Sequence, residues 1–292
     1  MLRGIAVTLC ALLCVTSEFA GGAEADGDTQ TLAAGGGLPA SIPGQRVIFR
    51  SHDLKLVGIL FAPPGAGPFP AILWNHGSER NPGSRHQFEA VARYFVPAGF
   101  VVFAPVRRGH GYSEGQYIAT TLDTVRRTQG SDAVNREMVR LLESEHRDDE
   151  LAGLSYLTSL KIVDASRLIV AGCSYGGIET LLAAEGTSPF KAAIAISPAA
   201  LSWSENPYIR RRLFLGVNRI NIPVLLLQPA KDASLEPSRV LGAEFMRPGK
   251  DFTAKTFPAV GPADEQKHCF GGGSGTHVWA ADALAFIARV LR

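Results

Sequence analysis

A serine stands among glycines at residues 172–177, where the chain reads Gly-Cys-Ser-Tyr-Gly-Gly. An apolar run at 167–171 predicts a buried strand directly before it, and a helical pattern follows. The flanking glycines let the backbone turn so tightly that the Ser174 hydroxyl would stand exposed above a sheet. This strand, turn and helix together predict that Ser174 is a nucleophile. Because a serine hydroxyl alone is a weak nucleophile, the chain must also supply a base.

Imidazole can take and return a proton near neutral pH, so the base is sought among the histidines. His277 ends a glycine-rich stretch just ahead of the predicted final helix, and we expect it to be the base. His268 is the main alternative. His268, Cys269 and His277 are also a conceivable metal site, but the sequence has neither H-E-x-x-H nor cysteines paired at zinc-site spacing. We therefore expect no metal and no cofactor.

A carboxylate would be needed to hold the histidine in its working tautomer and to stabilise the imidazolium. Asp232 lies five residues past an apolar, strand-type run at 224–227 and falls between the serine and the histidine in the chain. We expect it to be this carboxylate. Asp251 is farther from the strand, and Glu236, on the same loop as Asp232, is the possible substitute.

These side chains need a scaffold that brings distant parts of the chain together. Short apolar runs typical of buried strands alternate with helical patterns. The expected strands are 46–50 paired with 54–61, then 71–75, 100–104, 167–171, 192–196 and 224–227; the expected helices are 88–95, about 133–160, 178–184, 238–245 and 284–291. Such alternation predicts an α/β protein with a mostly parallel sheet covered on both faces. In such sheets the chemistry gathers at the carboxyl ends of the strands.

The order Ser174, Asp232, His277 on late strands of an alternating sheet resembles the α/β-hydrolase superfamily, and within it the dienelactone-hydrolase-like and prolyl-oligopeptidase-like esterases and peptidases. Residues 74–78, Trp-Asn-His-Gly-Ser, and 108–115, Arg-Gly-His-Gly-Tyr-Ser-Glu-Gly, add to the likeness. The second motif is similar to an R-G-x-G-x-S-x-G turn. The resemblance runs from about Gln45 to the C-terminus.

The resemblance implies an α/β-hydrolase fold with a minimal cap and a serine hydrolase that cleaves small carboxylic esters through an acyl-enzyme on Ser174. It also implies that the backbone N–H groups of Tyr175 and Ser78 bind the oxyanion. Dienelactone hydrolases use cysteine as nucleophile, whereas here Cys173 only precedes the serine. Peptide or amide hydrolysis is the alternative, although no segment is long enough for a β-propeller. A binding module that kept the fold without the chemistry is another.

The first residues differ in character from the rest. Arg3, an uncharged apolar run at 4–15 and Ala23-Glu24-Ala25 are typical of a signal peptide. A membrane anchor is the alternative, but the run is shorter than the ~20 residues that span a bilayer. We expect a leader at 1–25, a flexible segment at 26–44 and the α/β-hydrolase domain at 45–292, exported to the periplasm or beyond and free of the membrane once the leader is removed.

The composition limits the other classes. The 292 residues are 46% hydrophobic, which is enough for a packed core and excludes a disordered chain. With 29 basic and 27 acidic residues, the charge is too scattered for a nucleic-acid-binding surface. Beyond the leader the cysteines are Cys173 and Cys269. We favour two unpaired thiols, and a bridge between them in an oxidising compartment is the alternative.

Overall fold

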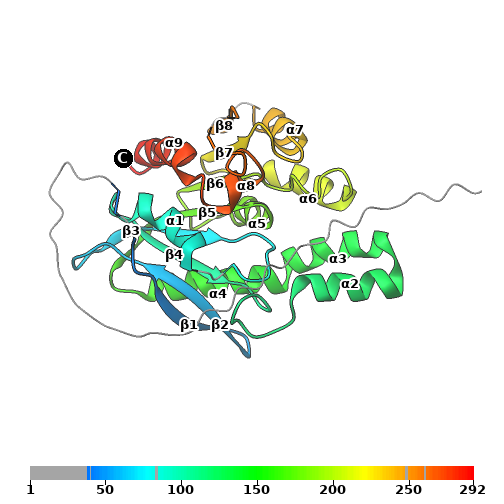
Figure 1. Cartoon of the computed structure of the whole chain (residues 1–292), viewed down its shortest axis with the longest axis horizontal. Coiled ribbons are helices and arrows are strands. Elements are labelled where there is room, and N and C mark those ends of the chain that lie inside the picture. Colours follow the sequence, from blue (N-terminus) through cyan, green and yellow to red (C-terminus); the bar gives the residue numbers. More distant parts are fainter. Residues whose placement is uncertain (1–37, 40, 83–84, 247–248, 260) are drawn as a thin grey trace, which may run out of the picture. The chain divides into compact units, whose positions relative to one another are not determined.

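The computed structural model describes residues 38–292 except 40, 83–84, 247–248 and 260 (Figure 1). The predicted leader, and most of the predicted flexible segment, lie outside the described residues. The last part of that segment contacts the domain, because the Ile42 N–H donates to Glu89 and the Arg93 side chain donates to the Pro39 carbonyl. In the described part of the chain, no helix is both long and apolar enough to cross a bilayer.

The described strands form one eight-stranded sheet in the order β1-β2-β4-β3-β5-β6-β7-β8. Their bounds are β1 (Gln45–Ser51), β2 (Leu54–Phe61), β3 (Phe69–Asn75), β4 (Val101–Val106), β5 (Val163–Cys173), β6 (Ala192–Ile196), β7 (Val224–Pro229) and β8 (Phe252–Phe257). β2 pairs antiparallel with both β1 and β4, and all other neighbours pair in parallel. The expected fold class, a mostly parallel sheet in an α/β protein, is confirmed.

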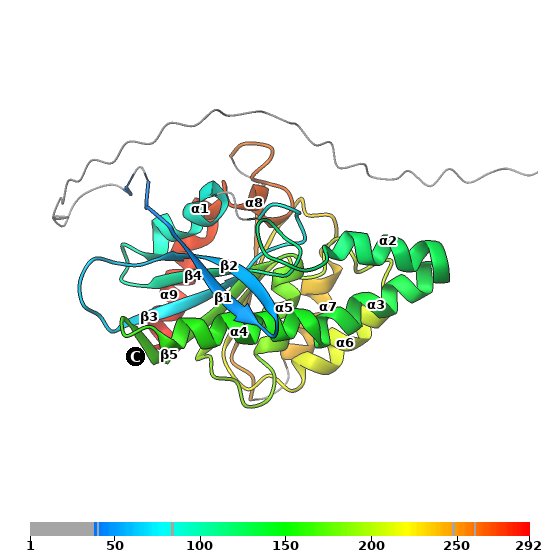
Figure 2. The same cartoon turned by 90° about the horizontal axis from the view of Figure 1, so that it is seen from below.

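Helices cover both faces of this sheet (Figures 1 and 2). On one face lie α1 (Arg85–Phe95), α8 (Cys269–Gly272) and α9 (Thr276–Val290); on the other lie α4 (Glu145–Ser159), α5 (Tyr175–Ala183), α6 (Pro207–Val217) and α7 (Glu236–Phe245). Successive strand residues point to opposite faces, so in β3 Ile72 and Trp74 pack on the first side and Leu73 on the second. The inner strands β3, β4, β6 and β7 are buried on both faces and therefore read as continuous apolar runs, whereas β1 and β8 at the two edges have exposed residues.

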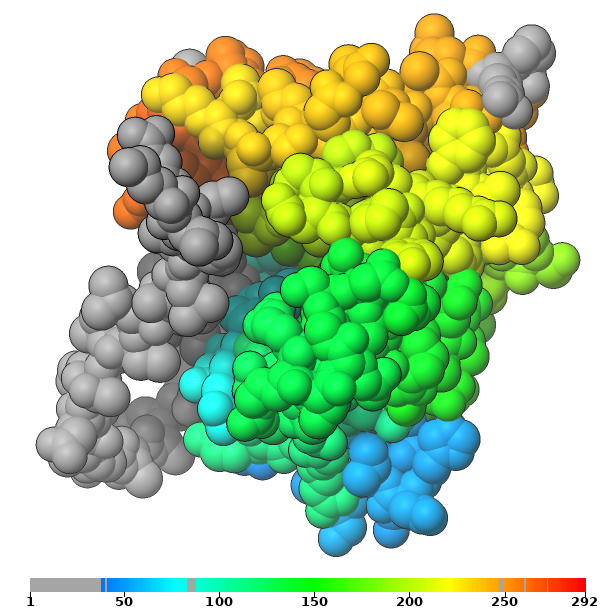
Figure 3. Space-filling model, turned by 90° about the vertical axis from the view of Figure 1, so that its right-hand side faces the viewer, coloured from blue at the N-terminus to red at the C-terminus, as the bar shows by residue number. Residues whose placement is uncertain are grey.

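Two helices project from the sheet between β4 and β5. α2 (Ile118–Gln129) and α3 (Ser131–Glu143) run side by side (Figure 2), and α3 contacts α6. In the space-filling end view of Figure 3, the green surface of this part of the chain lies against the yellow surface of a later part. Asn135 donates to the Glu205 carbonyl while Asn206 donates to the Asn135 carbonyl, so the contact is fixed by a reciprocal pair of hydrogen bonds. The helical stretch predicted at 133–160 is thus real but is broken at Ser144 into α3 and α4.

Four of the described elements have no counterpart among the predictions: α2, α6, α8 and β8. In α2 only Ile118 is buried, and β8 is an edge strand whose four middle residues are exposed. α6 includes three consecutive arginines at 210–212. α2 and β8 bury too few residues to show an apolar period. In α6 the exposed Phe214 and Leu215 obscure the period of the buried residues, and α8 is only four residues long.

Glycines allow β3 and α5 to approach closely at the end of β5. A Cβ added to Gly172 would lie 2.6 Å from the Asn75 carbonyl oxygen, and one added to Gly176 would lie 2.0 Å from the same atom. Neither distance is compatible with a side chain, because the opposing atom belongs to the backbone and cannot rotate away. The turn that carries Ser174 is therefore possible only with glycine at these positions.

Gly176, where α5 approaches β3, and Gly242, in α7, should respond differently to replacement by alanine. Gly176→Ala should lower the free energy of unfolding by about 3 kcal/mol or more, since backbone must move to admit the methyl group. Gly242→Ala, in α7, would place its Cβ 3.6 Å from the Phe252 ring, an ordinary contact. It should leave stability unchanged or raise it by up to about 1 kcal/mol. Urea unfolding of both variants tests this, and equal losses would contradict it.

Candidate active site

Ser174 lies at the sharp bend between β5 and α5. Its backbone has φ 59° and ψ −117°, a conformation that typically costs a non-glycine residue about 1–3 kcal/mol. The bend is held at one end by the Ser174 N–H, which donates to the Ile196 carbonyl at 3.0 Å, and at the other by the start of α5. The side chain is partly exposed at the carboxyl ends of the strands.

His268 connects Ser174 to Asp232. Its Nε2 lies 2.8 Å from Ser174 Oγ and its Nδ1 lies 2.7 Å from Asp232 Oδ1. Because a carboxylate only accepts, the imidazole proton is assigned to Nδ1, which leaves Nε2 free to accept the serine hydroxyl. The structure therefore brings together the predicted serine, the predicted aspartate and a histidine in one chain of hydrogen bonds.

The Asp232 side chain is completely buried, and both of its carboxylate oxygens accept hydrogen bonds. Besides His268, it accepts from the Ala233 N–H at 2.7 Å and from Gln228 Nε2 at 2.9 Å. Burial tends to raise the pKa of Asp232, but hydrogen bonds from His268, Ser197 and Gln228 outweigh it, so the pKa is lowered overall. Asp232 is therefore ionised next to the imidazole. Gln228, the penultimate residue of β7, was not among the predicted site residues.

The prediction of His277 as the base is corrected by this geometry. His277 sits in the first turn of α9, half exposed, with Nε2 3.4 Å from a Glu265 carboxylate oxygen and Nδ1 3.3 Å from the Ser274 carbonyl. The helix holds it there, whereas His268 precedes α8 on the loop that reaches Ser174. The glycines before His277 form the passage from α8 to α9.

The alternative carboxylates are engaged elsewhere. Asp251 forms an ion pair with Arg289, and Glu236 forms one with Arg239. The metal site considered for His268, Cys269 and His277 is not formed either, because the Cys269 sulfur is bonded to another cysteine and both nitrogens of His268 have partners. Among the residues that the structure describes, no group of three His, Cys, Asp or Glu side chains is placed to hold a metal ion.

Cys173 and Cys269 form a disulfide, with their Cα atoms 6.0 Å apart. The expectation of two unpaired thiols was wrong, and the alternative holds. Spacing in the sequence could not reveal this pairing, because the two cysteines lie 96 positions apart and meet only once α8 packs at the end of β5.

The segment after His268 has unusual backbone geometry. Cys269 and Phe270 have φ 57° and 52°, in the left-handed region that costs a residue with a side chain roughly 1–2 kcal/mol. The buried Phe270 ring packs edge-on against Phe257 with ring centres 5.4 Å apart, and the Cys269 N–H donates to Ser197 Oγ at 3.4 Å. These contacts and the disulfide hold a backbone that would otherwise relax.

The loop after β3 lies beside the serine. A Cβ added to Gly77 would be 3.6 Å from Ser174 Cβ. The Arg107 guanidinium donates to the His76 carbonyl at 2.7 Å and also to the Gly77 carbonyl. In a trans peptide the N–H points opposite to the carbonyl, so the N–H groups of Gly77 and Ser78 point away from Arg107. The oxyanion role of Ser78 and Tyr175 stays a prediction.

His76 and His110, which lie in the two resemblance motifs, are buried structural residues. His76 Nε2 accepts the Arg107 backbone N–H at 3.0 Å, so its proton is assigned to Nδ1, which donates to the Gly77 carbonyl at 2.7 Å. Burial, followed by the Arg107 charge, holds the pKa of His76 well below its usual value and lowers that of His110 to about 3. Both rings are therefore neutral and take part only in packing and hydrogen bonding.

A group of buried charges lies under this loop. Arg107 pairs with Glu179 at 2.6 Å, and both side chains are almost completely buried. Close by, Asn75 Nδ2 donates to Glu150 at 2.6 Å. Burial raises the pKa of Glu150 to about 7, although Arg147, Asn75 and Arg107 act in the other direction. Glu150 therefore loses its proton near neutral pH.

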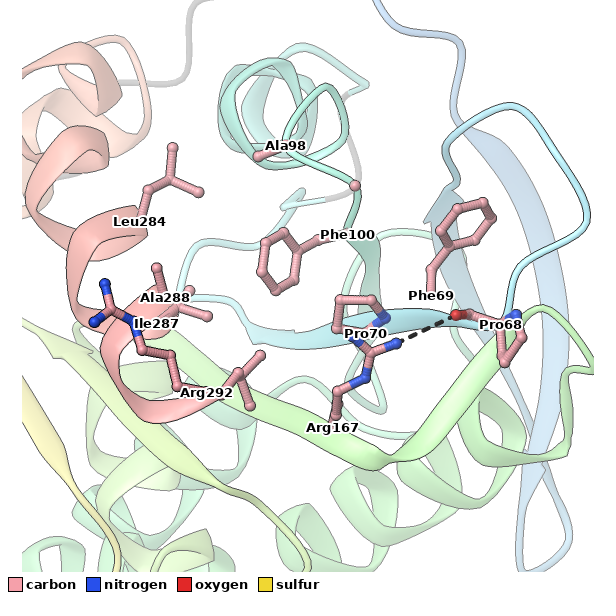
Figure 4. A pocket seen from close by; sticks show the side chains of 12 residues that line it. Pro68, Phe69, Pro70, Ala98, Phe100, Arg167, Leu284, Ile287, Ala288 and Arg292 are labelled. Atoms are coloured by element: carbon pink, nitrogen blue, oxygen red, sulfur yellow. Dashed lines mark hydrogen bonds between the residues drawn. The ribbon is translucent and has the colours of Figure 1, made fainter.

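A groove lies at the amino ends of the strands, at the opposite end of the sheet from Ser174. Its lining includes Phe69 at the start of β3, Phe100 just before β4, and Leu284 and Ile287 of α9, with Arg167 and Arg292 at its rim (Figure 4). Phe69, Phe100 and Arg167 lie at or near the amino ends of β3, β4 and β5, whereas Ser174 and Asp232 follow the carboxyl ends of β5 and β7. The groove is therefore separate from the group of residues around Ser174.

Comparison with known proteins places these residues in a wider context. The sequence model of the prolyl oligopeptidase family, Peptidase S9, matches residues 127–206, which include Ser174. The uncharacterized peptidase YtmA of Bacillus subtilis is 24% identical over 213 residues, covering 65% of this chain and 73% of that protein.

Two solved structures illustrate the likeness in fold. The acylaminoacyl peptidase of Pyrococcus horikoshii matches with a TM-score of 0.62 and 20% identity, over 86% of this chain but only 42% of its own length. Est1E of Butyrivibrio proteoclasticus, solved with ferulic acid bound, matches with a TM-score of 0.62 and 20% identity, over 84% of this chain and 99% of its own. The chain has the α/β-hydrolase fold, and it resembles serine hydrolases of the prolyl-oligopeptidase type.

Glu150 predicts a pH dependence of stability. A carboxyl group whose pKa is raised in the folded protein contributes stability that is present below its unfolded value and is lost as the pH rises through the folded value. Between pH 5 and pH 8 the wild type should therefore lose roughly 2 kcal/mol that Glu150→Gln keeps. Urea unfolding at both pH values measures this difference.

The exposed Glu205 provides the matched control. Glu205→Gln should follow the wild type at both pH values. If Glu150→Gln also runs parallel to the wild type, Glu150 is already ionised at pH 5 and the prediction is wrong.

Proposed function

We propose that this chain is a serine hydrolase in which Ser174 is the nucleophile, His268 the general base and acid, and Asp232 the carboxylate that orients and stabilises the imidazolium. One observation carries the proposal: the continuous hydrogen bonding from Ser174 Oγ through His268 to the buried Asp232. A serine at a strained bend, with a base in reach and a carboxylate behind that base, is an arrangement suited to acyl transfer.

The reaction proceeds in two halves. Ser174 Oγ attacks the carbonyl carbon while its proton passes to His268 Nε2, and the imidazolium then gives that proton to the leaving alcohol oxygen. The acyl group remains on Ser174 as an ester. Water attacks this ester, again losing a proton to His268, and the acid leaves as Ser174 regains its hydrogen. In the proposal the N–H groups of Tyr175 and Ser78 stabilise the oxyanion in both halves.

Carboxylic esters are the proposed substrates. This is supported by the match to Est1E, which extends over 99% of that protein, whereas the match to the acylaminoacyl peptidase extends over 42%. Amide or peptide hydrolysis is the second candidate, because the family match and the Bacillus subtilis relative both carry the name of peptidases. The two candidates share the acyl-enzyme and differ in the leaving group.

We also propose that the chain is exported by the leader at residues 1–25. The charged start and apolar run support this proposal. The Cys173–Cys269 disulfide supports it independently, because such bonds form and persist in oxidising compartments.

Removal of the nucleophile gives the first functional prediction. The wild type should hydrolyse short-chain nitrophenyl esters with a higher kcat/KM than aminoacyl nitroanilides, and Ser174→Ala should lose at least about 10⁴-fold on both. The variant should fold normally, as judged by circular dichroism. A fluorophosphonate probe should label the wild type at Ser174 and leave the variant unlabelled.

The opposite results would assign other functions. Faster turnover of anilides than of esters would support the peptidase candidate. A folded wild type with no adduct on Ser174 and no turnover would support a binding module and reject the hydrolase.

The two histidines provide a second functional prediction. His268→Ala should lower ester kcat/KM by about 10⁴-fold, because it removes the imidazole that is hydrogen-bonded to Ser174 Oγ. His277→Ala removes a half-exposed ring and should stay within about threefold of the wild type. Initial rates of nitrophenyl acetate hydrolysis measure both, and a large loss in the His277 variant would restore it as the base.

A further inference from the structure

The disulfide joins the two residues that directly adjoin the proton-transfer pair. Cys173 immediately precedes Ser174, and Cys269 immediately follows His268. A single covalent bond thus ties the turn that carries the hydroxyl to the loop that carries the imidazole. The mechanism proposed above uses neither sulfur atom.

The turn and the loop differ in how firmly they are held. Ser174 is fixed between a central strand and a buried helix. His268 follows a stretch, 261–267, that contains no strand or helix, and α8 after it is only four residues long. The two residues after His268 both have left-handed backbone, a conformation that persists only where the surroundings impose it.

Several contacts hold this loop. His268 Nδ1 lies 2.7 Å from Asp232, Lys231 Nζ donates to Gln266 at 2.9 Å, and Glu265 lies 3.4 Å from His277. The Phe270 ring, buried against Phe257, fixes the loop to β8 at the edge of the sheet. Toward the serine turn, Cys269 has the disulfide and one long hydrogen bond, 3.4 Å, to Ser197 Oγ. Among these contacts the disulfide is the covalent one, and it joins the residue after His268 directly to the residue before Ser174.

We propose that the Cys173–Cys269 disulfide is a positioning cross-link for His268, and that its reduction by a dithiol releases the imidazole from Ser174 and switches hydrolysis off reversibly. This inference rests on the proposed function for its effect on turnover. Cys173 and Cys269 are positioning residues, because they act through the histidine and contact no substrate.

The redox step is a thiol–disulfide exchange. A thiolate of the dithiol attacks one cysteine sulfur and forms a mixed disulfide, and the second thiol of the dithiol then displaces that cysteine and closes its own disulfide. The dithiol loses two electrons, the bridge gains two, and Cys173 and Cys269 each end with a proton. Both cysteines are partly exposed, so a small dithiol can reach them.

Loss of the cross-link should affect kcat more than KM. Proton transfer needs the hydroxyl and the imidazole within hydrogen-bond distance, here 2.8 Å, and a displacement of about 1 Å can slow a reaction by about 10²-fold. Ester binding at the turn and at the oxyanion loop does not require the imidazole. We expect reduction to lower kcat at least tenfold and to change KM by less than about threefold.

The experiment compares the full chain before and after treatment with dithiothreitol. A thiol assay should show two more free thiols after treatment, circular dichroism should be unchanged at the assay temperature, and kcat should fall as stated. Reoxidation should restore kcat. The double variant Cys173→Ser/Cys269→Ser should have the same low kcat and should no longer respond to dithiothreitol.

A readout that needs no turnover completes the test. In the oxidised protein, proton NMR should show the His268 Nδ1–H, shifted downfield by its bond to Asp232 and absent from the His268→Ala variant. Reduction should remove this signal or shift it upfield. A bridge that merely stabilises the fold would leave it in place.

The outcomes separate the two proposals. An oxidised enzyme that neither turns over esters nor reacts with a phosphonate rejects the hydrolase, while the NMR signal still tests the positioning of His268. A reduced enzyme with two new thiols, full kcat and an unchanged signal overturns the cross-link proposal and leaves the hydrolase intact. A fall in kcat that only follows the unfolded fraction also overturns it.

Discussion

The bend at Ser174 is the constraint on which the rest of the site depends. With φ 59° and ψ −117°, this residue leaves β5 and enters α5 within a single position, which lifts its hydroxyl off the sheet. The turn fits only because Gly172 and Gly176 let backbone approach the Asn75 carbonyl, closer than any side chain would permit. The partly exposed Ser174 hydroxyl therefore comes with a strained backbone at Ser174 and with no side chains at positions 172 and 176. Large α/β sheets can carry this cost because the core on both faces is extensive.

The buried pair of Arg107 and Glu179 lies under the same turn, and Arg107 bonds the backbone beside it. Burial of an ion pair is costly, and such a pair is weak evidence for stability. Arg107, however, also donates to the carbonyls of His76 and Gly77, so its charge fixes the orientation of two peptide units beside Ser174. The neutral His76 ring accepts the Arg107 backbone N–H and donates to the Gly77 carbonyl, so it links the same two segments. The polar interior therefore serves to orient backbone at the site, which an apolar core could not do.

Sequence reasoning succeeded where the signal was local. The apolar runs predicted seven of the eight strands, and the glycines around Ser174 predicted the turn, because both features depend on residues near one another in the chain. No local sequence pattern distinguishes His268 from His277 as the base. The choice between them depends on how the loop at 261–267 packs in the folded protein, where its contacts include the Phe270 ring on Phe257, the Lys231–Gln266 hydrogen bond and the disulfide. A glycine run pointed to His277, but those glycines serve the passage between two helices. The edge strand β8 was not predicted, because its middle residues are exposed and give no apolar pattern.

The pairing of Cys173 with Cys269 shows what was missing from the choice of histidine. Each cysteine neighbours a residue of the hydrogen-bonded group, so knowledge of the bridge would have selected His268 over His277 from the sequence alone. A loop with little secondary structure can hold a side chain to hydrogen-bond accuracy only if something else restrains it, and here a covalent bond supplies part of that restraint. Such bonds form and persist in oxidising compartments, so the proposed export would also favour the bond that the proposed positioning of His268 uses.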